Sequence, residues 1–212
     1  MNALSVFILS IFMVLLCTPV KAQSQKPDSP ATHAGEWTSP DEHDILWRKR
    51  VDRDLDITAV ANQVFINPRT SFINLLIEGI KSEKIMAYSA ANDSLTTMLN
   101  KDDLAINATT QFERYRIKED WMFDKQSGKM VIHIVGIAPM KLSENTDATR
   151  PAYRPAFWIN YANVRGYLAQ KPAGETPSDS TTWYDYFERR LFSSKIVKLE
   201  GYPPPEKDVW VK

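Results

Sequence analysis

The chain has 212 residues, a single cysteine, and 26 basic residues that balance 26 acidic ones. This balance gives no electrostatic reason to expect nucleic acid or an anionic membrane surface as the main partner. The length allows one domain with tails and a sizeable hydrophobic core.

The N-terminal segment has the pattern of a secretory signal peptide. Residues 3–17 form an apolar run without a charged residue, which is shorter than the about 20 residues that a membrane-spanning helix needs. A Val-Lys-Ala sequence follows and ends at Ala22, which matches the small-residue cleavage pattern. We therefore expect residues 1–22 to be removed between Ala22 and Gln23, with an uncleaved membrane anchor as the alternative.

Cys17, the only cysteine, lies within this segment and raises the question of lipid attachment. The bulky Leu16 precedes it, at a position where a lipoprotein signal takes a small residue. We therefore expect no lipid on the mature chain. Because cleavage would also remove Cys17, disulfide bonds are excluded from the mature protein.

The ends of the mature chain differ in composition from its middle. Residues 23–44 carry three prolines and mostly small polar side chains, and Trp37 is their only large apolar residue, so this segment is predicted to be a flexible arm. Residues 201–212 contain a tyrosine followed by three prolines, at positions 202–205, and are predicted to form a Pro-rich tail. The remaining residues, 45–200, would form the folded domain.

Residues 45–57 fit two kinds of secondary structure. Trp47, Val51 and Leu55 recur every four residues, as on one side of a helix, whereas Val51, Leu55 and Ile57 would share one face of a strand. The sequence leaves this choice open.

The next segments have shorter patterns. Residues 70–81 are predicted to form a helix that Thr70 or Ser71 caps, with an apolar stripe of Phe72, Leu75, Leu76 and Ile80. Weaker patterns predict a short strand at residues 84–88 and short helices at residues 101–108 and 164–171. Polar, proline-bearing loops are expected at residues 143–155 and 172–182, with an extended segment at 157–161 between them.

The clearest strand pattern starts at Phe112. The odd-numbered positions Tyr115, Ile117, Trp121 and Phe123 are apolar, and the even-numbered positions Arg114, Arg116, Lys118 and Asp120 are charged. A turn at residues 124–128 joins it to the apolar run 130–138, so the two form a predicted β-hairpin. The second strand is apolar on both parities and should lie inside a sheet with both faces covered. Trp121 should be buried in the core or in an interface.

Residues 183–192 are predicted to form an amphipathic helix with an aromatic face. Together the segments predict an α+β fold: a single compact domain with a sheet that contains the hairpin, packed helices, a flexible N-terminal arm and a Pro-rich C-terminal tail.

No pattern in the sequence predicts an active site, a metal or a cofactor. The three histidines, His33, His43 and His133, have no spacing that would place two of them on one metal ion. Glu119 and Asp120 are neighbours on a strand and would point to opposite faces, where Arg116 or Lys118 could pair with them. Glycine-rich nucleotide-binding motifs are absent from the sequence.

Four runs of residues carry a resemblance to a known family. They are 75–81 (LLIEGIK), 115–126 (YRIKEDWMFDKQ), 134–139 (IVGIAP) and 190–198 (RLFSSKIVK). They resemble the GldN/PorN family, and the similarity covers roughly residues 47–198. It implies a periplasmic component of the type IX secretion system of Bacteroidetes, which also supports gliding motility in some species. It further implies self-association in a ring beneath the outer membrane with a GldK/PorK-like lipoprotein, and contact with the periplasmic domain of a GldM/PorM-like motor protein.

The expected function is therefore that of a non-catalytic structural part of this machinery, without a cofactor and without a membrane span of its own. One alternative is a periplasmic hydrolase that acts on the cell wall, with Glu119, Asp120 and His133 as its only acid–base groups. The other is a monomeric periplasmic binding module that uses its aromatic residues as a platform.

The aromatic helix is the predicted contact surface for a partner. Aromatic residues beside arginines are typical of the centre and edge of a protein interface. The residues expected to make this contact are Trp183, Tyr184, Phe187 and Arg190. The competing interpretation places the same side chains in the core.

Overall fold

The computed structural model describes residues 39–91, 94–104, 112–143, 152–174 and 180–202, and the backbone of residues 210–211. It contains one antiparallel β-sheet with eight strands in the order β2-β6-β4-β3-β1-β7-β8, where β5 also pairs with β4. The strands are β1 (Ile45–Asp56), β2 (Ala87–Tyr88), β3 (Arg114–Asp124), β4 (Lys129–Leu142), β5 (Tyr153–Pro155), β6 (Trp158–Asn160), β7 (Ser194–Leu199) and β8 (Trp210–Val211). The predicted single α+β domain is confirmed.

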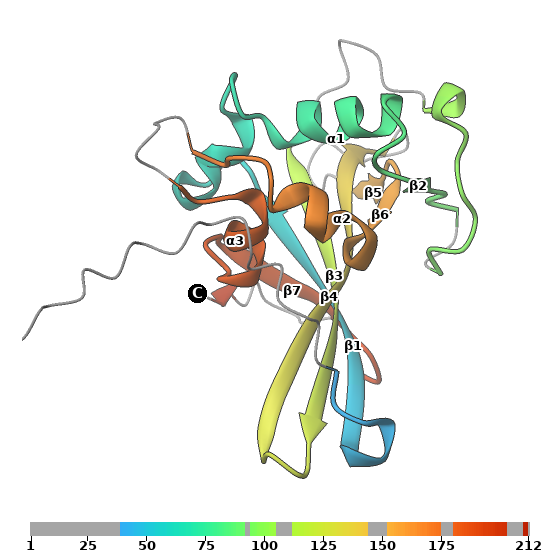
Figure 1. Cartoon of the computed structure of the whole chain (residues 1–212), viewed down its shortest axis with the longest axis vertical. Helices are drawn as coiled ribbons and strands as arrows, with labels where there is room; N and C mark the ends of the chain where they lie inside the picture. The colour runs from blue at the N-terminus through green and yellow to red at the C-terminus, as the bar shows by residue number, and fades with distance from the viewer. Residues whose placement is uncertain are drawn as a thin grey trace, which may run out of the picture.

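The helices cluster around one half of the sheet, as Figure 1 shows. The α-helices there are α1 (Phe72–Lys81), α2 (Tyr161–Leu168) and α3 (Trp183–Glu188). Short 3-10 helices cover Val60–Ile66 and Lys101–Asp103, and a third, Glu42–Asp44, lies at the opposite end of the sheet, directly before β1. Among the described residues, no helix is both long and apolar enough to cross a membrane.

The hydrophobic core lies between these helices and the body half of the sheet. Its largest side chains are fully buried: Phe65, Phe72, Tyr115, Phe157, Tyr161, Trp183 and Phe187. The rings of Phe72 and Trp183 lie 4.6 Å apart between centroids, and Phe65 packs on both. Such aromatic contacts add to the free energy gained by burying apolar area.

The segment that fitted two patterns is a strand. In β1, alternate residues such as Val51 and Leu55 are fully buried against the core, and Arg53 lies on the same face. Trp47 has the same parity, so the four-residue spacing of Trp47, Val51 and Leu55 is compatible with one strand face as well as with a helix. The segment is a strand because it pairs with β3 along its length.

The predicted hairpin is β3 and β4, joined by the turn at residues 125–128, where Gly128 has a φ of +66°. Tyr115 and Ile117 are buried, as their parity predicted. Both faces of β4 are covered only in its second half, because residues 131–133 are half-buried. Met122, on the polar parity, is also buried.

The predicted helices are present with shifted bounds. Ser71 occupies the N-cap position of α1, and Phe72, Leu76 and Ile80 are buried. The helix expected at residues 164–171 is α2, which starts at Tyr161 and ends at Leu168. The expected helix at residues 101–108 is a 3-10 turn over Lys101–Asp103, and residues 105–108 lie outside the described residues.

The helix predicted at residues 183–192 is shorter than expected. α3 begins with a capping box in which the Thr182 side chain and the Asp185 backbone and side chain bind each other. It ends at Glu188, because Arg190 has a φ of +53°, which is incompatible with a continuing right-handed helix. The predicted leader and residues 23–38 of the arm lie outside the described residues.

Candidate interaction surface

The outer halves of β1, β3 and β4 extend beyond the helices as a three-stranded ribbon (Figure 1). We define the ribbon as residues 45–50, 119–124 and 129–135 with the turn 125–128 at its tip, and we call the rest of the domain the body. β7 pairs with β1 only at residues 51–54, and β6 pairs with β4 only at residues 136–137. Within the described residues, both outer edges of the ribbon therefore have no neighbouring strand.

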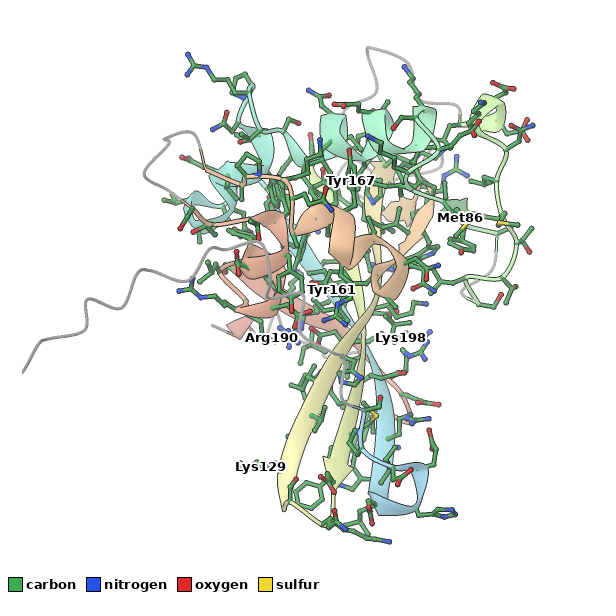
Figure 2. All side chains as sticks on the ribbon, viewed as in Figure 1. Met86, Lys129, Tyr161, Tyr167, Arg190 and Lys198 are labelled. Carbon is green, nitrogen blue, oxygen red and sulfur yellow. The ribbon has the colours of Figure 1, made fainter. Side chains whose placement is uncertain are left out.

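The ribbon leaves the body at a neck where two β-bulges lie close together. One interrupts the pairing of β3 with β4 beside Lys118 and Glu119, and the other interrupts the pairing of β1 with β7 beside Asp52 and Arg53. A bulge bends its strand and increases the local twist. Figure 2 shows Arg190 and Lys198 on either side of this neck, and Lys129 near the tip of the ribbon.

A buried ion cluster fills the helix side of the neck. The carboxylate of Glu119 is 0% exposed and accepts hydrogen bonds from Arg53 Nε at 3.0 Å and Trp121 Nε1 at 2.7 Å, and another from Arg190 Nη1. Arg53 also donates to Ser194 Oγ at 3.0 Å. Two guanidinium groups thus share one buried carboxylate, and removal of the carboxylate would leave buried positive charge without a partner.

The opposite face of β1 and β3 carries a ladder of oppositely charged residues. The cross-strand partners are Arg50 with Asp120, Asp52 with Lys118, Asp54 with Arg116, and Asp56 with Arg114. Arg116 binds Asp54 through two hydrogen bonds, of 2.7 and 2.9 Å. Lys118 is buried, with its ammonium nitrogen 4.6 Å from the ring centroid of Trp158. Directly opposite pairs of unlike charge stabilise a sheet and specify its register.

Apolar side chains line the outer part of the ribbon. Trp47 stacks on Phe123 with 6.2 Å between ring centroids and an interplanar angle of 19°. Leu46 is 64% exposed and Met130 is 43% exposed. No α-helix covers this part of the sheet in Figure 1, and Leu46, Trp47 and Met130 are the exposed large apolar side chains among the described ribbon residues.

The three acid–base candidates are divided between the two faces. Glu119 is held by arginines on the helix side, whereas Asp120 and His133 are direct cross-strand partners on the other face. Asp120 is bound by Arg50 and Glu119 by Arg53, whereas Arg116 or Lys118 was the partner expected for these carboxylates. The arginines that bind these carboxylates come from neighbouring elements: Arg50 and Arg53 from β1, and Arg190 from the residues after α3.

His133 is half-buried, and its Nδ1 lies 3.4 Å from Ser39 Oγ. Burial lowers the pKa of His133, and the carboxylates of Glu188 and Asp120 oppose this effect. No group of three or more His, Cys, Asp or Glu residues that could hold a metal ion occurs in the described part of the chain.

The predicted contact residues of the aromatic helix fall into two groups. Trp183 and Phe187 are fully buried in the core, so the interpretation of these two as contact surface is corrected. Tyr184 is half-buried beside Arg165, and Arg190 forms an ion pair with Glu119. The helix is too short to offer an aromatic face to solvent as well as to the core. The predicted cleavage residues, Ala22 and Gln23, lie outside the described residues.

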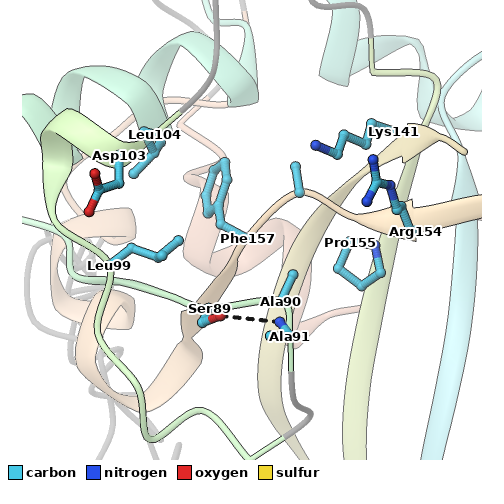
Figure 3. Close-up of a pocket in the computed structure, with 11 residues that line it drawn as sticks. Ser89, Ala90, Ala91, Leu99, Asp103, Leu104, Lys141, Arg154, Pro155 and Phe157 are labelled. Atoms are coloured by element: carbon cyan, nitrogen blue, oxygen red, sulfur yellow. Dashed lines mark hydrogen bonds between the residues drawn. The ribbon is translucent and has the colours of Figure 1, made fainter. Parts of the chain in front are cut away.

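A surface cavity of about 370 Å³ lies at the other end of the body (Figure 3). Lys141 and Arg154 are cross-strand partners on one wall, Phe157 and Leu99 provide apolar surface, and Asp103 lies opposite. Two like charges side by side favour an anionic group between them. The sequence did not predict this cavity, because its residues come from separate segments with no common motif.

Sequence reasoning also missed the ion cluster and the charge ladder. A signal for the ladder was present, because residues 50, 52, 54 and 56 read Arg, Asp, Asp, Asp and residues 120, 118, 116 and 114 read Asp, Lys, Arg, Arg. These two series are complementary only in an antiparallel pairing. No comparable signal identified Arg190, which lies 71 residues from Glu119.

The comparisons with known proteins agree with the resemblance of the four sequence runs. No curated protein sequence matches the chain. The family described as gliding motility associated protein GldN matches residues 40–203, which include the whole ribbon and every strand of the sheet except β8. This family comprises structural components of the gliding motility and type IX secretion machinery. The chain belongs to the GldN family.

Proposed function

We propose that this chain is a non-catalytic part of a periplasmic ring, built with an outer-membrane lipoprotein of the GldK/PorK kind. In this proposal it also contacts the periplasmic domain of a GldM/PorM-like motor protein. The observation that carries the proposal is the ribbon. Among the described residues no α-helix covers the three-stranded ribbon, and its exposed Leu46, Trp47 and Met130 form a surface suited to partners.

A ring requires each copy to offer two different surfaces that fit each other, so that one contact repeated with rotation closes on itself. The ribbon has two different edges, and its two faces differ in chemistry. One carries Trp47 and Phe123, and the other carries Arg48 and Asp120. The geometry therefore supports assembly through unlike surfaces better than it supports a two-fold dimer.

The contacts of the candidate groups count against the hydrolase alternative. The Glu119 carboxylate accepts three hydrogen bonds, two of them from arginines, and it lies on the opposite face of β3 from Asp120 and His133. General acid and base groups must reach the same reacting atoms. A carboxylate enclosed in this way stabilises the neck and is not available to a substrate.

The route to the periplasm is part of the proposal. The mature chain would begin at Gln23, after removal of residues 1–22, and would carry no lipid. The intact mass of the protein isolated from its native envelope tests this. A mass that corresponds to a chain beginning with acylated Cys17 would contradict it.

The ribbon can be tested against a matched region of the body. The paired change Trp47→Ser and Met130→Ser removes apolar surface from the ribbon, and Val60→Ser with Ile66→Ser removes exposed apolar residues from the body. In a strain that lacks the native copy, we expect the ribbon variant to lose type IX export and the large particle isolated from the outer membrane. The body variant should retain both.

Two results would overturn the proposal. One is a deletion strain that exports type IX substrates normally. The other is native protein that fractionates from the envelope only as a small species.

The contact surface on α3 remains a proposal for Tyr184 and Arg190. Arg190→Ala would also disturb the ion cluster, so Tyr184→Ala is the cleaner variant. We expect a folded Tyr184→Ala protein to co-purify with less of the lipoprotein than the wild type. Unchanged co-purification, with an unchanged circular dichroism spectrum, would remove α3 from the interface.

A further inference from the structure

The two free edges of the ribbon belong to β1 and β4, on opposite sides of β3. Within the described part of the chain, no further strand pairs with the outer side of β1 over residues 45–49 or with the outer side of β4 over residues 129–135. The β4 edge reads KMVIHIV and carries a lysine only at its start. Natural edge strands usually carry charges or proline that block the addition of another strand. This edge has neither along most of its length.

The direction of the strands restricts how two copies could join. β1 and β4 each pair antiparallel with β3, so they run in the same direction. When two copies stand side by side in the same orientation, β4 of one meets β1 of the next as a parallel pair.

Charge favours this parallel arrangement over the antiparallel one. In the parallel pair, Lys129 at the start of β4 lies beside the acidic segment Asp41–Asp44 that precedes β1 in the next copy. In an antiparallel pair, Lys129 would lie beside Arg48 and Lys49 instead. Unlike charges at adjacent positions stabilise a strand pair, and like charges destabilise it.

We propose that the β4 edge of the ribbon binds the β1 edge of a second copy of this chain as a parallel strand pair. The contact is head-to-tail, because it joins two different edges, and each added copy again offers one free edge of each kind. A closed ring would leave no ribbon edge unpaired. This inference deepens the proposed function and rests on it for the ring, while the contact itself rests on the two edges and their charges.

Engineered cysteines give a direct test. Leu46→Cys and Met130→Cys are placed together in a Cys17→Ser background, which leaves no other cysteine. Within one chain the two positions lie on either side of β3, about 10 Å apart, which is too far for a disulfide bond. In cells without the native copy, mild oxidation should yield a ladder of covalent dimers, trimers and higher species. Each single variant should remain monomeric.

The matched control is Val60→Cys with Met98→Cys, because these side chains are 85% and 65% exposed on the body. This pair should give no ladder. If Leu46→Cys with Met130→Cys gives no ladder either, or gives dimers alone, the head-to-tail edge contact is wrong. Type IX export, measured in the same strains without the oxidant, separates the edge contact from the proposed function. Normal export without cross-links refutes the contact and leaves the proposed function standing, whereas normal export in the deletion strain refutes that function.

Charge reversal provides a second measurement that does not depend on a disulfide at one site. Lys129→Glu in the cysteine background should lower the yield of the ladder about threefold, as expected for the loss of one exposed ion pair. The further change Asp41→Lys in the same chain should restore it, because every copy then carries the reversed pair. Equal yields in all three chains would contradict the parallel arrangement.

Discussion

The body and the ribbon are built from the same three strands but are stabilised by different interactions. In the body, β1, β3 and β4 lie under helices, and side chains such as Leu55, Ile117 and Ile137 are fully buried. In the ribbon, no α-helix of the described part of the chain covers the same strands, and cross-strand stacking and an ion pair join them to one another. A strand can therefore continue past the hydrophobic core of its domain when charged cross-strand pairs specify its register.

The transition between the two regions is abrupt. Glu119 closes the core on the helix side, and the next residue, Asp120, already belongs to the ribbon's ion pairs. The charge ladder continues into the body, where Asp52, Asp54 and Asp56 face basic residues of β3, so what ends at the neck is the layer of α-helices and not the pairing of charges. Four variants test how sharp this division is.

The largest loss of stability should come from the body. Trp183→Ala should lower the free energy of unfolding by about 4 kcal/mol, because it leaves a cavity among Phe65, Phe72 and Phe187. Trp183→Phe is the control and should cost less, because the indole nitrogen has no hydrogen-bond partner among the described residues. Chemical denaturation measures both. Equal losses would mean that the indole nitrogen contributes more than its contacts indicate.

The neck should come next. Glu119→Gln keeps the shape of the side chain but removes its charge, so Arg53 and Arg190 lose their shared counterion, and we expect a loss of about 3 kcal/mol. Denaturation of the variant at neutral pH is the measurement. A variant as stable as the wild type would show that the arginines find other partners and that the cluster does not connect body and ribbon.

Trp121 should have an intermediate effect, because it is half-buried and not part of the core. Trp121→Ala should cost about 2 kcal/mol, through lost apolar contact and the lost hydrogen bond to Glu119. A loss of stability as large as that of Trp183→Ala would show that Trp121 belongs to the body. The division between body and ribbon would then lie closer to the tip of the ribbon.

His133 should have the smallest effect, and a pH-dependent one. Its pKa is lowered in the folded protein, so below the ordinary value of about 6.5 the unfolded chain binds more protons than the folded one. The stability that His133 contributes is present above that value and is lost as pH falls through the folded pKa. Between about pH 7 and pH 5, the wild type should therefore lose more stability than His133→Gln. Parallel pH profiles of the two proteins would contradict this.

The sequence predicted the regular parts of this fold because local patterns determine them. The hairpin followed from the parity of Tyr115 and Ile117, and α1 followed from its apolar stripe. β1 stayed ambiguous because Trp47, Val51 and Leu55 fit both periods, and only pairing with β3 resolves it.

The candidate surface was harder to predict, because it depends on contacts between distant segments. Arg190 reaches Glu119 only through the end of α3 and a left-handed backbone conformation, which no periodicity reveals. An aromatic face such as that of α3 has the same composition in a core as in an interface, so sequence could not separate Trp183 from Tyr184. The free edges of the ribbon are defined by where β6 and β7 stop pairing, which is a property of the whole sheet.

The continuity of β1, β3 and β4 from the core to the tip has a mechanical consequence. A force that pulls the tip of the ribbon along its strands acts parallel to them, so many interstrand hydrogen bonds of the body resist it at the same time. A force across the ribbon would instead open the bonds one after another, from the tip inward. The molecule is therefore stiff along the axis of the ribbon and compliant across it, so the direction of loading decides whether the ribbon transmits a force to the body or peels open.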